Sequence, residues 1–182
     1  MLQKYKKFAL LILILNSISC NQTSNNSDMA AKETIKVGQK APGFILPDKN
    51  GNNVTLSDYL GKANIVLFFY PKDESYGCTK EACSFRDSYE DFKDAGAEVI
   101  GISSDNQTSH QEFAVHHQLP FILLSDKDRK IAKLYGVGNT LGLLPGRVTF
   151  VIDKNGIIRM IYSSQVNFEK HVKEAVEALR KM

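Results

Sequence analysis

Outside its first residues, the sequence has almost no net charge. Its 182 residues carry a formal net charge of +3. Lys4, Lys6 and Lys7 lie within the first nineteen residues, which contain no acidic residue, and without these three lysines the charge of the chain is zero. Nucleic-acid-binding proteins usually present a basic patch or stripe. We therefore expect no nucleic-acid partner.

The apolar run near the N-terminus is too short to span a membrane. It extends from Phe8 to Leu15, whereas a transmembrane helix needs about 20 residues. The run follows a short basic region and precedes small residues, a pattern typical of a secretory signal peptide. We expect a signal peptide at residues 1–19; a buried helix is the alternative.

Cys20 follows this run directly. The residues before it, Ser17-Ile18-Ser19, resemble a bacterial lipobox, in which the cysteine is lipidated, but they would also suit an ordinary signal peptidase. The following residues are too polar to pack. We expect lipidation at Cys20, a flexible tether at residues 20–34 and one folded domain at 35–182. These features predict an extracytoplasmic protein of the bacterial cell envelope, lipid-anchored to a membrane.

Strand and helix patterns alternate through the domain, and no internal repeat interrupts them. Two short strands flank a turn at Asn50-Gly51, and the apolar run 64–70 indicates a central strand buried on both faces. Further strands are predicted at 97–103, 121–125, 147–153 and 156–163, and helices at 78–95, 108–119, 129–136 and 168–179. The order predicts an α/β fold, with a mixed sheet flanked by helices and an N-terminal β-hairpin.

Cysteine is scarce, yet two of the three cysteines lie close together in "FFYPKDESYGCTKEACSF". Cys78 is placed in the first turn of a predicted helix, where free backbone N–H groups and the helix dipole favour the thiolate, the reactive form. The preceding loop offers the Ser75 hydroxyl as donor and acceptor, and Pro71 fixes the chain as it leaves the strand. These features indicate a reactive cysteine at position 78.

The spacing of Cys78 and Cys83 limits what the pair can do. Five residues of helix separate the Cα atoms by about 8.6 Å, and a disulfide requires less than about 7 Å. The pair therefore cannot bond while the helix is intact, but it could bond if the helix unwound. Two thiols without a nearby histidine fall short of a metal site. Two unrelated free thiols remain an alternative.

The segment "YPKDESYGCTKEACSFRD" resembles the active site of peroxiredoxins of the bacterioferritin-comigratory, or peroxiredoxin Q, subgroup. The family motif Pro-x-x-x-Thr/Ser-x-x-Cys matches Pro71, Ser75 and Cys78. The resemblance implies that Cys78 is the peroxidatic cysteine and Cys83 the resolving cysteine. It also implies an active-site arginine, which "PGRVTFVIDKNG" supplies as Arg147, and it extends from about Val37 to the C-terminus.

This resemblance implies a thioredoxin-like fold and a thiol-dependent peroxidase. Hydrogen peroxide and organic hydroperoxides would be the substrates, an intramolecular disulfide the intermediate, and a thioredoxin-like protein the reductant. We expect no metal or organic cofactor, and a monomer. The backbone of Gly77 would bind peroxide, and Tyr76, which replaces the subgroup's usual proline, would stand at the mouth of the pocket. A disulfide carrier, which usually needs Cys-x-x-Cys, and a non-catalytic sensor are the alternatives.

The remaining polar residues are expected to have structural rather than catalytic roles. Glu81 is expected to complement the helix N-terminus rather than to act in catalysis. The four histidines lie on predicted helices and are expected to be exposed or partly buried. His116 and His117 are interpreted as a solvated pair, because adjacent side chains on a helix diverge.

Overall fold

The computed structural model describes residues 35–140 and 144–182. The strands are β1 Ile45–Pro47, β2 Asn53–Thr55, β3 Asn64–Phe69, β4 Ala97–Ser103, β5 Ile122–Ser125, β6 Asn139–Thr140, β7 Leu144–Pro145, β8 Val148–Ile152 and β9 Ile158–Ser163. The helices are α1 Tyr76–Asp87, α2 Tyr89–Asp94, α3 Gln107–His116, α4 Lys130–Leu134 and α5 Phe168–Leu179, with a 3₁₀ turn, η1, at Leu56–Asp58. The predicted signal peptide, tether and lipidated Cys20 lie outside the described residues.

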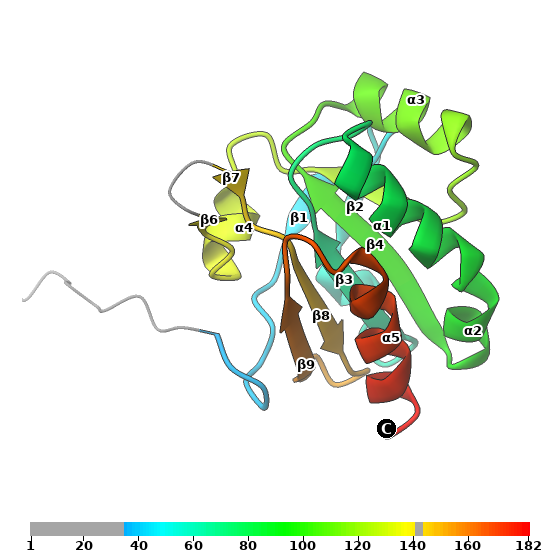
Figure 1. The fold of residues 1–182 in the computed structure, drawn as a ribbon. Coiled ribbons are helices and arrows are strands. Elements are labelled where there is room, and N and C mark those ends of the chain that lie inside the picture. The colour runs from blue at the N-terminus through cyan, green and yellow to red at the C-terminus, as the bar shows by residue number, and fades with distance from the viewer. Residues whose placement is uncertain (1–34, 141–143) are drawn as a thin grey trace, which may run out of the picture. The chain divides into compact units, whose positions relative to one another are not determined.

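A five-stranded mixed sheet forms the centre of the domain (Figure 1). Its order is β5-β4-β3-β8-β9, with β3, β4 and β5 parallel and β8 and β9 antiparallel to their neighbours. The separate pair β1 and β2 forms the expected N-terminal hairpin. The predicted α/β class, with helices flanking a mixed sheet, is therefore confirmed.

β3 is buried on both faces, as its unbroken apolar sequence predicts. Val66 and Phe68 belong to a core that also contains residues of α1, α2, α3 and α5. Ile65 and Leu67 belong to a second core that includes residues of α4 and of the β1–β2 hairpin. The alternation of side chains along a strand separates the two cores. This packing fixes the carboxyl end of β3, from which the chain runs into α1.

Local details differ from the sequence-based expectations. The helix predicted at 78–95 is two helices, because Ser88 leaves helical geometry at φ −103° and ψ 13° and separates α1 from α2. Thr55 occupies the N-cap of the 3₁₀ turn. The short pair β6 and β7 carries no periodic pattern in the sequence and was not predicted. Among residues 35–140 and 144–182, no helix is long and apolar enough to cross a membrane.

Candidate active site

Cys78 lies beside Arg147 at the start of α1. Its Sγ is 3.1 Å from Arg147 Nη2, and both side chains are buried. The register of the sheet explains the contact. Phe69 at the end of β3 pairs with Val148 at the start of β8, so the loop leading to α1 and the residue preceding β8 meet at one edge. A cation within hydrogen-bond distance stabilises a thiolate.

Glu81, one turn after Cys78, is fully buried and accepts a short hydrogen bond from Arg147 Nη1. The expectation that it complements the helix N-terminus is wrong. α5 packs against α1, so this face of the helix is turned away from water. Burial lowers the pKa of Arg147, but the charges of Glu81 and Cys78 raise it by more. The guanidinium therefore remains charged between the carboxyl and the sulfur.

The Glu81 carboxyl also faces His171 of α5. Glu81 Oε1 lies 3.4 Å from His171 Nδ1. His171 Nε2 is 2.9 Å from the carbonyl oxygen of Ser164, to which it donates, and Nδ1 is 2.8 Å from the Thr149 hydroxyl. Burial raises the pKa of Glu81 to about 7, although Arg147 lowers it, and burial lowers the pKa of His171 to about 4. Burial thus favours the uncharged form of both side chains.

Two of the histidines lie deeper than the sequence suggested. His110 and His171 are fully buried, and the expectation of exposed or partly buried positions is wrong for both. Each is placed on a helix face that packs on the sheet, and each finds polar partners there. His110 Nδ1 lies 2.9 Å from Asp73 Oδ2. Helical spacing alone gave no sign that these polar side chains have buried partners.

Phe168 and Gly77 shape the surroundings of Arg147. The Phe168 ring lies 5.0 Å from the Arg147 guanidinium carbon, at cation–π distance. A Cβ on Gly77 would come within 2.7 Å of that ring and 3.3 Å of Arg147 Nη2. Glycine at position 77 therefore lets α1, Phe168 and the arginine pack closely. The sequence gave no signal for Phe168, because nothing local connects the start of α5 to the cysteine loop.

The loop before α1 is fixed by hydrogen bonds within itself and to α3. The Ser75 hydroxyl donates to the carbonyl oxygen of Lys72 over 3.0 Å, and Ser75 occupies the N-cap of α1. The buried Asp73 carboxylate accepts from the Tyr70 and Ser109 hydroxyls, each over 2.7 Å. These bonds place Ser75 at the helix start, close in sequence to Cys78.

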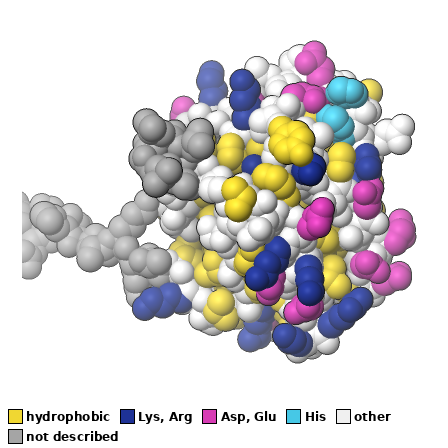
Figure 2. Space-filling model, in the orientation of Figure 1, with side chains coloured by type: hydrophobic (Ala, Val, Ile, Leu, Met, Phe, Trp, Pro, Cys, Tyr) yellow, Lys and Arg dark blue, Asp and Glu magenta, His cyan; other side chains and the backbone are white. Residues whose placement is uncertain are grey.

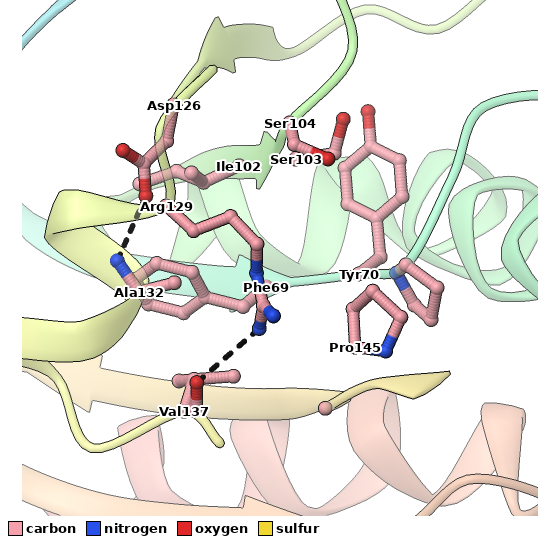
Figure 3. Close-up of a pocket in the computed structure, with 12 residues that line it drawn as sticks. Phe69, Tyr70, Ile102, Ser103, Ser104, Asp126, Arg129, Ala132, Val137 and Pro145 are labelled. Carbon is pink, nitrogen blue, oxygen red and sulfur yellow. Dashed lines mark hydrogen bonds between the residues drawn. The ribbon is translucent and has the colours of Figure 1, made fainter. Parts of the chain in front are cut away.

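Pro71 begins this loop and lines a small pocket at the carboxyl ends of β3 and β4, shown in Figure 3. The pocket has room for about one water molecule. The Arg129 side chain crosses it to donate to the carbonyl oxygen of Val137 over 3.3 Å. Cys78 is not among its lining residues. Pro71 shares this pocket with Pro145 and Gly146, the two residues that precede Arg147.

Cys83 and Tyr76 are more exposed than Cys78 and Arg147. Both Cys78 and Cys83 are free thiols of one intact helix; Cys83 is only partly buried. Tyr76, the first residue of α1, is 75% exposed. It borders an open surface groove together with Val166 and Phe168. The structure therefore brings Cys78, Arg147 and Gly77 together, whereas the Tyr76 side chain is exposed and Cys83 is only partly buried.

The ionisation of Glu81 should make the free energy of unfolding depend on pH. A carboxyl with a pKa of about 7 in the folded chain and an ordinary value when unfolded stabilises the fold fully below about pH 4.5, and this stabilisation is lost as pH rises through 7. Glu81→Gln cannot ionise, so it should not lose this stabilisation. We expect the unfolding free energy of Glu81→Gln minus that of wild type to rise by about 3 kcal/mol from about pH 4.5 to pH 8. Urea unfolding across this range measures the difference.

His171 has the opposite sign, because its lowered pKa stabilises the fold above about pH 6.5 and the effect is lost toward pH 4. Since His171 is present in both proteins, its contribution largely cancels in the comparison. Identical pH dependence in Glu81→Gln and wild type would contradict a buried carboxyl that titrates near neutrality.

Comparison with known proteins identifies relatives across the whole described domain. The AhpC/TSA family profile matches residues 37–161. The chain is 54% identical over 147 residues to the chloroplastic peroxiredoxin Q of Arabidopsis thaliana, covering 80% of this chain and 68% of the relative. It is 50% identical over 149 residues to the chloroplastic peroxiredoxin Q of Suaeda salsa, covering 81% and 69%.

Solved structures agree with these matches. Peroxidoxin BcpB from Mycobacterium tuberculosis superposes with a TM-score of 0.76 at 37% identity, covering 81% of this chain and 98% of that one. Peroxiredoxin Q from Xanthomonas campestris has a TM-score of 0.69 at 29% identity, covering 76% and 90%. The thioredoxin-like fold implied by the resemblance is confirmed.

The expected location in the bacterial cell envelope is wrong. The curated relatives named above are chloroplast proteins of plants, and neither name indicates a lipid anchor. The expectation rests on residues 1–20 alone, where a basic start, an apolar run and a cysteine together resemble an export signal. The domain itself is shared with these relatives. The chain belongs to the AhpC/TSA family and, within it, to the peroxiredoxin Q group of thioredoxin-dependent peroxidases.

Proposed function

We propose that the chain reduces hydrogen peroxide and organic hydroperoxides with Cys78 as the peroxidatic cysteine. The Cys78 thiolate attacks one peroxide oxygen, an S–O bond forms, and the O–O bond breaks. The other oxygen leaves as water or an alcohol after taking a proton, and Cys78 becomes a sulfenic acid. The observation that carries this proposal is the 3.1 Å contact between Cys78 Sγ and Arg147 Nη2 at a helix N-terminus.

The neighbouring groups would assist this step in different ways. Arg147 stabilises the thiolate before attack and the negative charge that develops on the leaving oxygen. The Ser75 hydroxyl and the backbone N–H groups of Gly77 and Cys78 would bind the peroxide oxygens. Glu81 would hold the guanidinium in place through its buried hydrogen bond. All these groups come from one chain, so the proposed chemistry needs no second copy.

Tyr76 would act on substrate size rather than on the reaction. Its exposed ring borders the same groove as Phe168, which packs on Arg147. An alkyl group carried by an organic hydroperoxide could lie along these rings while its O–O bond faces Cys78. Pro71 would fix the exit of the chain from β3. We assign neither residue a role in bond breaking.

Regeneration would use Cys83. Once α1 unwinds at its start, the Cys83 thiolate attacks Cys78 Sγ, the S–O bond breaks with loss of water, and an intramolecular disulfide forms. A thioredoxin-like dithiol then reduces this disulfide by exchange and is itself oxidised. The partial exposure of Cys83 and its position on the same helix support this step.

Replacement of the resolving cysteine tests this mechanism. In Cys83→Ser we expect one equivalent of peroxide to be consumed at a rate close to wild type, because Cys78 and Arg147 are unchanged. Turnover with thioredoxin should fall at least about tenfold, since no intramolecular disulfide is available for exchange. Mass spectrometry after one equivalent of peroxide should show sulfenic acid at Cys78 in the variant and a disulfide in wild type.

Ser84→Ala provides a matched control, because it alters the next residue of α1 without touching a thiol. It should turn over like wild type. Turnover of Cys83→Ser at the wild-type rate would show that another group resolves the sulfenic acid.

A further inference from the structure

A cluster of Glu74, His116 and His117 lies outside the machinery described so far. His116 Nδ1 is 3.1 Å from Glu74 Oε1, and His117 Nε2 is 2.9 Å from Glu74 Oε2. The ligand atoms of the three side chains all lie within 4.8 Å of one another. Figure 2 shows the histidines of this face gathered beside acidic side chains, at the end of the molecule where Figure 1 places α3.

The two histidine rings converge, contrary to the expected divergence of adjacent helical residues. Their centroids are 4.4 Å apart. The reason is that α3 ends at His116, and His117 has left helical geometry with φ −102° and ψ 8°. The expected divergence is therefore wrong: both imidazoles turn toward one carboxylate.

The carboxylate is itself held in an unusual position. Glu74 has φ +55°, a region that residues other than glycine seldom adopt, and such residues gather where the surroundings fix them. The same carboxylate therefore presents one oxygen to each imidazole, Oε1 to His116 and Oε2 to His117.

We propose that Glu74, His116 and His117 form a binding site for a divalent transition-metal ion of the Zn²⁺ class. Two imidazole nitrogens and a carboxylate are ligands that zinc accepts, and water would complete a four-coordinate site. The cluster is accessible, since the Glu74 and His116 side chains are 46% and 71% exposed. Small rotations of these exposed side chains would bring the three ligand atoms to zinc distances of about 2 Å.

The position of the cluster connects it to the cysteine helix. Glu74 directly precedes Ser75, the N-cap of α1. The carbonyl oxygen of His117 accepts a hydrogen bond from Arg86 Nη1, in the last turn of α1, over 2.8 Å. His117 therefore contacts both ends of the segment that contains Cys78 and Cys83. A metal ion that ties Glu74 to His117 would hold these ends together and slow the unwinding that disulfide formation requires.

Metal binding is tested without any enzymatic readout. Untagged full-length chain, with all three cysteines replaced by serine and with bound metal removed, is titrated with Zn²⁺ by calorimetry. We expect one ion per chain, and an affinity at least about tenfold weaker in Glu74→Gln and in His116→Asn. Glu90→Gln, which removes an exposed carboxylate from α2, should bind like the parent. Absence of binding, or equal affinity in all four chains, overturns the site.

The effect on the helix depends on the proposed disulfide mechanism and is measured separately. Chain with its cysteines intact is mixed with peroxide in Zn²⁺ or in chelator, and the disulfide is quantified over time after alkylation of free thiols. We expect Zn²⁺ to slow disulfide formation severalfold in wild type and to have little effect in Glu74→Gln. Equal slowing in both proteins would show that Zn²⁺ acts by binding the thiols. It would overturn the proposed link between the Glu74 site and the unwinding of α1. Failure of wild type to form any disulfide would count against the peroxidase mechanism, while the calorimetry would still decide the metal site.

Discussion

Replacing Cys78 with serine is expected to lower the rate of peroxide reduction by at least about 10⁴-fold. A serine hydroxyl is almost entirely un-ionised at neutral pH, and it is a far weaker nucleophile toward a peroxide oxygen than a thiolate. Cys78 Sγ is also the only sulfur among the described residues that contacts Arg147. Loss of hydrogen peroxide, followed with dithiothreitol or a thioredoxin system as electron donor, measures the effect.

The fold should tolerate this substitution. Serine differs from cysteine mainly in one atom, and its hydroxyl can still accept from Arg147 Nη2. The melting temperature of Cys78→Ser should therefore lie within a few degrees of wild type, which separates loss of chemistry from loss of structure. A folded Cys78→Ser protein that still reduces peroxide at the wild-type rate would show that the reactive sulfur lies elsewhere.

The sequence predicted the scaffold of this site better than its electrostatics. Three features depend on local sequence patterns, and each is present in the structure: the buried strand in the apolar run 64–70, the hairpin turn at Gly51 and the helix start near Cys78. The pairing of Cys78 with Arg147 joins residues far apart in the chain. Spacing alone could not supply it, and it was expected only from the family resemblance.

The burial of Glu81 and His171 could not be inferred in the same way. Both are polar residues on amphipathic helices, where a solvated position is the usual outcome. They are buried because α1 and α5 pack against each other, and each finds a polar partner elsewhere in the fold, Arg147 for Glu81 and the carbonyl oxygen of Ser164 for His171. The break at Ser88 was missed for a related reason, since the apolar spacing of Phe85, Tyr89 and Phe92 continues through it.

Removal of the Arg147 charge should produce the second largest loss of activity. In Arg147→Met, a side chain of similar length keeps part of the packing against Phe168 but provides no cation for the thiolate or for the departing oxygen. We expect kcat/KM for hydrogen peroxide to fall about 10²- to 10³-fold, the usual cost of losing a preorganised donor to developing charge. Arg147→Lys should lose less, because a single ammonium retains the charge but cannot contact Cys78 and Glu81 together through two nitrogens.

Structural damage must be separated from this electrostatic effect, because Arg147 is buried and paired with Glu81. Without the guanidinium, the Glu81 carboxyl is expected to remain protonated to higher pH, so that no unpaired charge is left in the core. Arg159→Met is the matched control: it removes a half-exposed arginine that pairs with Asp153 over 2.6 Å, and should leave activity unchanged. If a folded Arg147→Met protein reduced peroxide as fast as Arg159→Met, the guanidinium would not be part of the reacting centre. We expect kcat/KM to fall most in Arg147→Met, less in Arg147→Lys and not at all in Arg159→Met. That order would assign the stabilisation of the thiolate and of the leaving oxygen to the Arg147 charge.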